Sequence, residues 1–171
     1  ANSAIVVGVD PEKDFPGHPL AGIEFQRDLE QKAYVAGGSN YNAPAQLVGD
    51  LLADKDSSEL GDITPSYTPG ITLTSFKGVL PNYVIEAVRE AMPAFDKKIK
   101  GFANADGLLT GVETRTSSPI CIKRGKDYQS INIKGLYPTG EGAGYAGGIL
   151  SSGIDGIKVA EALALDILAK Q

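Results

Sequence analysis

The stretch INIKGLYPTGEGAGYAGGILSSGIDGIKVAEALA, residues Ile131–Ala164, decides how the rest of the sequence is interpreted. Its first residues are typical of a strand and its last residues of a helix. Six glycines lie between Gly135 and Gly148. Because glycine has no Cβ, such a backbone can closely approach something large, flat or charged. The stretch therefore predicts a strand, a glycine-rich binding turn and a closing helix.

Residues Gly142–Gly147, GAGYAG, satisfy the G-x-G-x-x-G pattern of dinucleotide-binding proteins, between a strand-type and a helix-type segment. A Rossmann unit also needs a second strand after the helix, with an acidic residue about 20 residues on at its end. The acids that follow these glycines, Asp155, Glu161 and Asp166, lie inside the expected helix instead. The pattern therefore does not predict a self-contained NAD or ADP site.

The composition indicates a globular protein with one real core and excludes several functions. The chain has 171 residues, of which 42% are hydrophobic and 22% charged, and its formal net charge is −5. It has no basic cluster longer than two residues, which disfavours nucleic-acid binding. No apolar run approaches the roughly 18 residues of a membrane span, and there is no signal pattern. We expect a cytoplasmic protein that binds neither membrane nor nucleic acid.

The rare residue types restrict the chemistry further. Cys121 is the only cysteine, which excludes an internal disulfide and a cysteine-based metal cluster. His18 is the only histidine, so a zinc site or a catalytic triad would have to be built around it, and we expect no metal site. The chain begins with Ala1, and Met92 is its only methionine, which suggests a start that is processed, cut or engineered.

Hydrophobic periodicity and turn residues predict an α+β fold with a mixed sheet. We expect strands at residues 3–10, 71–76, 108–115 and 120–123, the last two forming a hairpin with Cys121 pointing into or across the core. We expect helices at residues 20–35, 42–52 and 81–99, with a kink or break before Pro93. Loops or turns are expected at residues 11–18, 54–61, 64–70 and 125–129.

Two helices carry apolar stripes. In the helix at residues 81–99 the stripe must face a core, and it contains Val84, Val88, Met92, Phe95 and Ile99. The closing helix should bring Gly153 and Gly156 close to another backbone, since glycine is otherwise unfavourable in a helix. Its stripe contains Leu150, Ile154, Ile157, Ala160, Ala164 and Ile167.

Residues Gly135–Gly148, GLYPTGEGAGYAGG, resemble the carboxy-terminal flavin motif of flavoproteins with two dinucleotide-binding domains, whose last strand reads G-L-a-x-x-G-[DE]. In detail the sequence is similar to bacterial FAD-dependent dehydrogenases or NAD(FAD)-utilising oxidoreductases of unassigned substrate. The likeness covers most of the chain and includes His18–Gln26, Ala43–Asp50, Pro65–Gly70 and Gly111–Pro119.

This resemblance implies a division of the chain into two parts. Residues 1–134 would form the middle, substrate-type domain, and residues 135–171 would supply the last strand and helix of the FAD-binding domain. The implied activity is transfer of hydride or electrons between a small organic substrate and FAD, with NAD(P)H as a possible electron donor or acceptor. The adenosine half of FAD would be held by an upstream portion of the same protein.

The resemblance also implies cofactor-binding residues in the turn, namely Gly140, Glu141, Gly142, Gly147, Gly148 and Ile149. Helix amino termini carry unpaired N–H groups, which would face the electron-rich pyrimidine edge of the flavin. Glu141 would accept hydrogen bonds from the ribityl chain or contact the pyrophosphate region, although a carboxylate there is also favoured by the helix dipole alone. Ser151 and Ser152 would add hydroxyl contacts or only cap the helix.

Arg115 and Tyr145 are the candidate substrate contacts. Arg115 offers planar donors for a carboxylate or phosphate, or else forms a surface ion pair with Glu113 or another acid. Tyr145 is placed to stack or hydrogen-bond, whereas His18 and Tyr67 have weaker claims. No catalytic residue is identified. Two alternatives stay open: a scaffold domain whose glycines only permit tight packing, and a protein that binds a nucleotide or phosphate directly on the turn.

Overall fold

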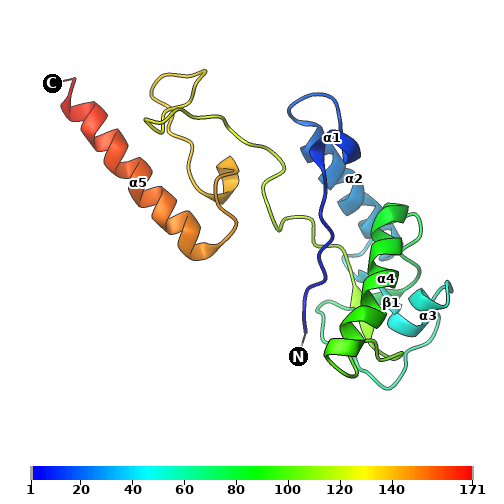
Figure 1. Cartoon of the computed structure of the whole chain (residues 1–171). Helices are drawn as coiled ribbons and strands as arrows, with labels where there is room; N and C mark the ends of the chain where they lie inside the picture. Colours follow the sequence, from blue (N-terminus) through cyan, green and yellow to red (C-terminus); the bar gives the residue numbers. More distant parts are fainter. Residues whose placement is uncertain (1, 171) are drawn as a thin grey trace. The chain divides into compact units, whose positions relative to one another are not determined.

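The computed structural model describes residues 2–170 and confirms an α+β fold with a small mixed sheet (Figure 1). The sheet has the order β2-β1-β3, in which β1 pairs in parallel with β2 and antiparallel with β3. In chain order the elements are α1 (Pro11–Asp14), α2 (Ala21–Ala36), β1 (Ala43–Leu47), α3 (Val48–Leu52), β2 (Ile71–Leu73), α4 (Asn82–Lys98), β3 (Leu108–Thr110), the 3-10 helix η1 (Glu141–Ala143) and α5 (Ile149–Leu168).

The chain forms two compact units. The first contains the residues up to Asp14 together with Arg27–Glu113, and it holds the sheet, α3 and α4. The second contains Phe15–Gln26 together with the chain from Thr114 onward, and it holds η1 and α5. The boundary that the sequence suggests at residue 134 concerns the organisation of a longer protein and stays a prediction.

The segment at residues 42–52 is the main error in the predicted elements, because its first half is the central strand. Ala43, Pro44 and Ala45 of β1 pair with residues of β2, and Ala45 is fully buried. Pro44 suggested a first helical turn, but its fixed φ also suits an extended backbone. Its carbonyl oxygen still accepts a hydrogen bond from Gly111 N at 3.2 Å. Only Val48–Leu52 is helical.

Helix α4 confirms the helix predicted at residues 81–99 and corrects two details. It continues through Pro93, which is exposed, so water can replace the backbone hydrogen bond that proline removes. Met92 is 1% exposed and Val88 packs on the core, whereas Phe95 and Ile99 are 38% and 62% exposed. The stripe therefore faces the core over only part of its length. The core cluster consists of Ala33, Leu51, Phe76, Val79 and Ile85.

Other predicted elements differ from those observed. Residues 3–10 form no strand and residues 120–123 pair with no strand in the described structure, so the predicted hairpin is wrong. The strand expected at the start of the glycine-rich stretch is a series of bends and turns. Residues 11–14, expected as loop, form α1, and Cys121 is exposed rather than in the core. The predicted helix at residues 20–35 is confirmed by α2.

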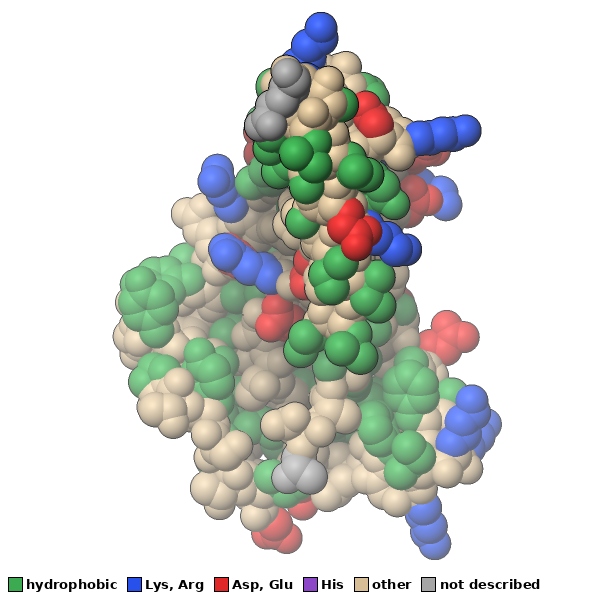
Figure 2. Space-filling model, turned by 90° about the vertical axis from the view of Figure 1, so that its left-hand side faces the viewer, with side chains coloured by type: hydrophobic (Ala, Val, Ile, Leu, Met, Phe, Trp, Pro, Cys, Tyr) green, Lys and Arg blue, Asp and Glu red, His purple; other side chains and the backbone are tan. Residues whose placement is uncertain are grey.

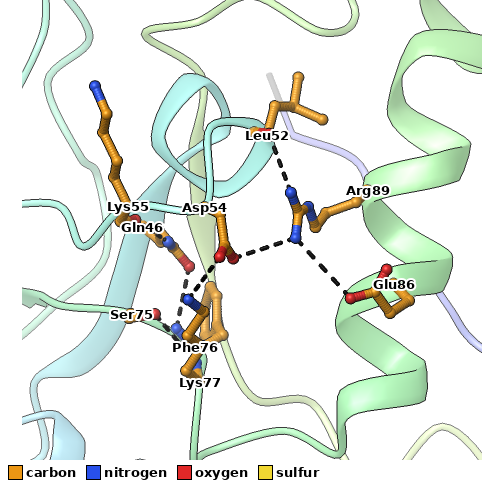
Figure 3. A network of polar contacts seen from close by, with 9 residues as sticks. All are labelled: Gln46, Leu52, Asp54, Lys55, Ser75, Phe76, Lys77, Glu86 and Arg89. Atoms are coloured by element: carbon orange, nitrogen blue, oxygen red, sulfur yellow. Dashed lines mark hydrogen bonds and ion pairs between the residues drawn. The ribbon is translucent and has the colours of Figure 1, made fainter.

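Gln46 joins three segments of the first unit through its buried amide. Its side chain is in β1 and the residue is 2% exposed. Its Nε2 donates to Lys55 O at 2.6 Å, and its Oε1 accepts from Phe76 N at 3.1 Å (Figure 3). A buried polar group that lacks such partners is costly. Gln46 therefore fixes the chain after α3 and the chain after β2 to the central strand.

A second polar cluster surrounds Asp54, just after α3. Its carboxylate pairs with Lys77 Nζ at 2.9 Å and with Arg89 NH1 at 3.2 Å (Figure 3). Arg89, on α4, also donates to Leu52 O at 3.3 Å. The hydrogen bond from Lys77 lowers the pKa of Asp54, and both cations add to this effect. The cluster attaches α4 to the loop that follows α3.

The Gln46 contacts generate a first prediction. Replacing Gln46→Leu keeps the side chain at a similar size but leaves Lys55 O and Phe76 N without their partner. We expect the free energy of unfolding in urea to fall by about 2–4 kcal/mol. Gln31→Leu on the exposed side of α2 is the matched control and should change it by less than about 0.5 kcal/mol. Equal effects of the two substitutions would contradict this role of Gln46.

Candidate functional site

The glycine turn of the second unit has a defined conformation. Gly140, with φ 68° and ψ −159°, precedes η1, and Gly144, with φ 82°, ends it in the left-handed region. Both conformations are readily adopted only by glycine. Tyr145 N donates to Gly140 O at 3.1 Å, which closes the turn on itself. The turn is therefore a preformed structural feature rather than an irregular loop.

The turn is anchored on the segment that was expected to form a hairpin. Ile122 N donates to Ala143 O at 3.1 Å, and Ser118 Oγ donates to Gly142 O at 3.2 Å. Residues 118–122 thus use their hydrogen-bonding groups on the glycine turn, which lies more than 20 residues later in the sequence. This long-range pairing explains why local periodicity predicted the wrong partner for the segment.

The glycines of the G-x-G-x-x-G pattern differ in what the fold requires of them. A Cβ on Gly144 would lie 2.6 Å from Ile120 O, so this position needs glycine for packing. A Cβ on Gly142 or Gly147 would meet nothing within 4 Å, and neither residue has a positive φ. The fold of the second unit therefore does not explain glycine at positions 142 and 147, whereas close approach of a ligand or of another part of the protein would.

A pocket of about 320 Å³ lies against the turn and brings several predicted residues together. Glu141, Tyr145 and Gly147 line it, and the carboxylate of Glu141 is exposed at the start of η1. Arg115 is exposed but is not among the residues that line this pocket, so its role stays a prediction. The full lining is Ser117, Ser118, Glu141, Gly144, Tyr145, Ala146 and Gly147.

The amino terminus of α5 follows directly after Gly147. Gly148 is its N-cap, and no side chain caps it. Ser151 Oγ donates to Gly148 O at 2.9 Å, so this hydroxyl binds the backbone and not an amide. Within residues 2–170, the amides of Ile149, Leu150 and Ser151 have no hydrogen-bond acceptor, and Ile149 is 94% exposed. These donors and the positive end of the helix dipole suit an electron-rich group.

Sequence reasoning missed the pair that holds this site together. Arg124 and Asp155 form a bidentate ion pair with distances of 2.6 and 2.9 Å, and their side chains are 10% and 14% exposed. The Arg124 guanidinium also lies 3.8 Å from the centroid of the Tyr145 ring. The signal available in the sequence was Asp155, one of three acids inside the expected helix, and nothing local distinguished it from Glu161 and Asp166.

The ion pair determines the protonation of both groups. The hydrogen bonds from Arg124, followed by the one from Gly140 N, hold the pKa of Asp155 well below its usual range. The Asp155 carboxylate in turn raises the pKa of Arg124. Both side chains are therefore charged at neutral pH.

Helix α5 has an unusual distribution of side chains. The residues that face its own unit include Asp155, Val159 and Asp166, and Val159 is the buried one. Much of the rest of its surface is apolar and exposed, and Figure 2 shows one such side along the helix. Gly153 and Gly156, expected to lie close to another backbone, have nothing near a Cβ position within the described chain. The exposed apolar residues are Ile149, Leu150, Ile154, Ile157, Leu163, Leu165, Ile167 and Leu168.

The remaining candidate residues do not line this pocket. His18 is exposed and its Nε2 lies 3.3 Å from Glu24 Oε2, while its Nδ1 accepts from Leu20 N. Tyr67 is half exposed. Within residues 2–170 no group of three or more His, Cys, Asp or Glu side chains is arranged to hold a metal ion. None of the described helices has the length and apolar character needed to cross a membrane.

Comparison with known families defines the class of protein. Residues 1–116 match the family described as "FAD-dependent protein, C-terminal domain-like". The chain therefore belongs to this family, and its resemblance to flavoproteins is confirmed at that level. The match ends before the glycine turn, so it does not test the residues of that turn, and it assigns no role to Arg115.

A particular relative extends the likeness. A protein of Clostridium beijerinckii, described only as uncharacterized, is 57% identical over 162 residues. The alignment covers 94% of this chain and 30% of the relative, so the chain spans less than a third of that protein's length. The similarity to this relative continues beyond residue 116.

The contrast between the glycines generates a second prediction. Gly144→Ala should lower the free energy of unfolding of the second unit by about 1–3 kcal/mol, because alanine there adopts a disfavoured φ and contacts Ile120 O. Gly142→Ala should change it by less than about 0.5 kcal/mol. Urea denaturation followed by circular dichroism measures both. A large loss with Gly142→Ala would show that the fold itself needs that glycine.

The ion pair generates a third prediction about pH. The pKa of Asp155 is lower in the folded chain than the value of about 3.9 expected when unfolded, so its contribution is fully present above pH 5 and is lost as the pH falls further. At pH 7, Asp155→Asn should cost about 2–4 kcal/mol of unfolding free energy. The difference between wild type and variant should shrink between pH 5 and pH 2.5. A difference independent of pH would contradict the ion-pair assignment.

Proposed function

We propose that this chain is the carboxy-terminal portion of an FAD-dependent oxidoreductase that moves electrons between a small organic substrate and the flavin. The family membership supports a flavoprotein, and the geometry of the glycine turn supports a cofactor site at its edge. The observation that carries the proposal is the start of α5, where exposed amides without acceptors follow a turn with two glycines that its own unit does not need.

The residues present fit part of a flavin cofactor. Gly142 and Gly147 leave space above the backbone, and the amides of Ile149, Leu150 and Ser151 offer donors at the positive end of a helix of 20 residues. These donors would stabilise the electron-rich edge of the isoalloxazine ring. When bound, the flavin supplies the redox chemistry, and the protein supplies orientation and electrostatics.

The other predicted contacts have distinct roles in this proposal. Glu141 has an exposed carboxylate in the pocket and would accept hydrogen bonds from hydroxyl groups of the cofactor. Gly140 and Gly148 would shape the backbone on either side. Tyr145 would form one wall, with one face of its ring covered by Arg124. Arg115 would bind an acidic substrate, and NAD(P)H would be the second redox partner.

The apolar exterior of α5 supports the proposed partner, an upstream FAD-binding portion of the same protein. Soluble proteins rarely expose such a long contiguous apolar surface. The C. beijerinckii relative is more than three times as long as the aligned region, which leaves ample chain for a domain that covers this helix. Gly153 and Gly156 lie on the exposed side and would permit close approach of that domain.

A fourth prediction tests the cofactor site in the full-length protein. The purified wild type should show flavin absorbance, and Gly142→Val or Gly147→Val should raise the Kd for FAD at least tenfold, because the added side chain fills the space over the turn. The Kd is measured by titrating apoprotein with FAD. Gly8→Val is the matched control, since it also lies in open space but outside the site, and should leave the Kd unchanged.

A colourless full-length protein that takes up no added FAD would contradict the proposal and favour a scaffold domain. Binding of ADP or NAD by residues 1–171 alone, measured by calorimetric titration, would favour direct nucleotide binding instead. Gly142→Val and Gly147→Val would then abolish this binding.

A further inference from the structure

We infer that Arg124 and Asp155 are positioning residues for the glycine turn, acting together as a charged clamp that sets the turn's shape before any ligand binds. The inference rests on the proposed function for its consequence in flavin binding. Its structural part concerns only the second unit, where all the residues involved are found.

Asp155 binds the residues at the start of the turn. Its Oδ2 accepts from Gly140 N at 2.9 Å, from Thr139 Oγ1 at 3.1 Å and from Arg124 NH1 at 2.9 Å. Gly140 has the unusual backbone conformation that starts η1, so the carboxylate holds the residue where the chain changes direction. Because Asp155 lies on α5, the same contact fixes the turn relative to the start of that helix.

Arg124 contacts residues on both sides of η1. Its NH1 donates to Pro138 O at 2.8 Å, and its guanidinium covers the Tyr145 ring. Its backbone N donates to Tyr145 Oη at 2.9 Å, and Tyr145 Oη donates to Ile122 O at 3.1 Å. Tyr145 is thus held by its ring face and by its hydroxyl group. Tyr145, which lines the pocket, is therefore held in place by Arg124 and Ile122, which do not line it.

The Arg124–Asp155 pair therefore acts on the pocket indirectly, through residues of the turn. Neither Arg124 nor Asp155 is among the residues that line the pocket, yet they contact Gly140 and Tyr145 on the two sides of η1. Such preorganisation lowers the ordering cost when a ligand binds. A planar, bidentate arginine suits this task, and lysine cannot reproduce both its fork and its stacking.

Helix α5 supplies a matched control. Asp166 lies on the same face of the helix, and its Oδ2 accepts from Tyr137 Oη at 2.7 Å and pairs with Lys170. This hydrogen bond raises the pKa of Tyr137 to about 12. Asp166 thus resembles Asp155 in charge and in bonding, but it has no hydrogen bond to the glycine turn.

The experiment uses the full-length protein and compares Asp155→Asn, Arg124→Lys and Asp166→Asn with wild type. We expect the first two variants to raise the Kd for FAD at least tenfold and to shift the visible absorption band of bound flavin. Hydrogen exchange measured by mass spectrometry should be at least tenfold faster in peptides covering residues 138–148. Asp166→Asn should leave the Kd within twofold of wild type, with the band and the exchange of this turn unchanged.

Each outcome has a separate meaning. A wild type that binds no FAD overturns the proposed function, and hydrogen exchange in the turn then decides the clamp on its own. If the wild type binds FAD and folded Asp155→Asn and Arg124→Lys behave as Asp166→Asn does, only the clamp is overturned. If Asp155→Asn does not fold, Thr139→Val removes one hydrogen bond to the same carboxylate and decides instead. Unchanged exchange in the turn of that variant and of Arg124→Lys would overturn the clamp.

Discussion

The partly buried ion pair between Arg124 and Asp155 is the interaction on which the second unit depends. As far as residue 170, this unit contains no strand and few buried apolar side chains, so it cannot rely on a hydrophobic core of its own. The paired charges compensate by collecting donors and acceptors from three segments, around residues 124, 139 and 155. Such a pair is favourable only when its geometry is good and its remaining lone pairs are satisfied, as they are here.

The two units therefore achieve stability by different means. The first unit has a central strand with buried side chains and a conventional apolar cluster around Phe76 and Leu51. Its polar groups, such as Gln46, are satisfied inside it. In the second unit, polar contacts lie on the inner side of α5, and the apolar side chains of this helix are exposed. That inversion is physically reasonable if, as we propose, another domain of the full-length protein covers this apolar face.

The sequence predicted the helices more successfully than the strands, for a physical reason. Helices α2, α4 and α5 have long stretches with local periodicity, which a single sequence reveals. The strands have only 3–5 residues each, and their pairing is decided by distant partners. Pro44 shows the difficulty, because its preferred φ is compatible with both a helix start and the strand that it occupies.

The sequence located the glycine-rich turn but not the ion pair, Arg124 and Asp155, that holds it in place. Glycine frequency is a local signal, so Gly140–Gly148 stood out without any knowledge of the fold. Arg124 and Asp155 are 31 residues apart and each is an ordinary charged residue in its local context. Only the folded chain brings them together beneath the turn.

The G-x-G-x-x-G pattern in this chain combines residues with different physical reasons for being glycine. Gly144 is needed because Ile120 O occupies the space of a side chain, and the positive φ would strain any other residue. Gly142 and Gly147 face open space, so their lack of a Cβ matters only to something outside the unit. A pattern match treats the three as equivalent, whereas the structure separates the glycine that forms the turn from those that leave its surface accessible. Only a ligand or another part of the protein could therefore require glycine at the two positions that the fold of this unit leaves free.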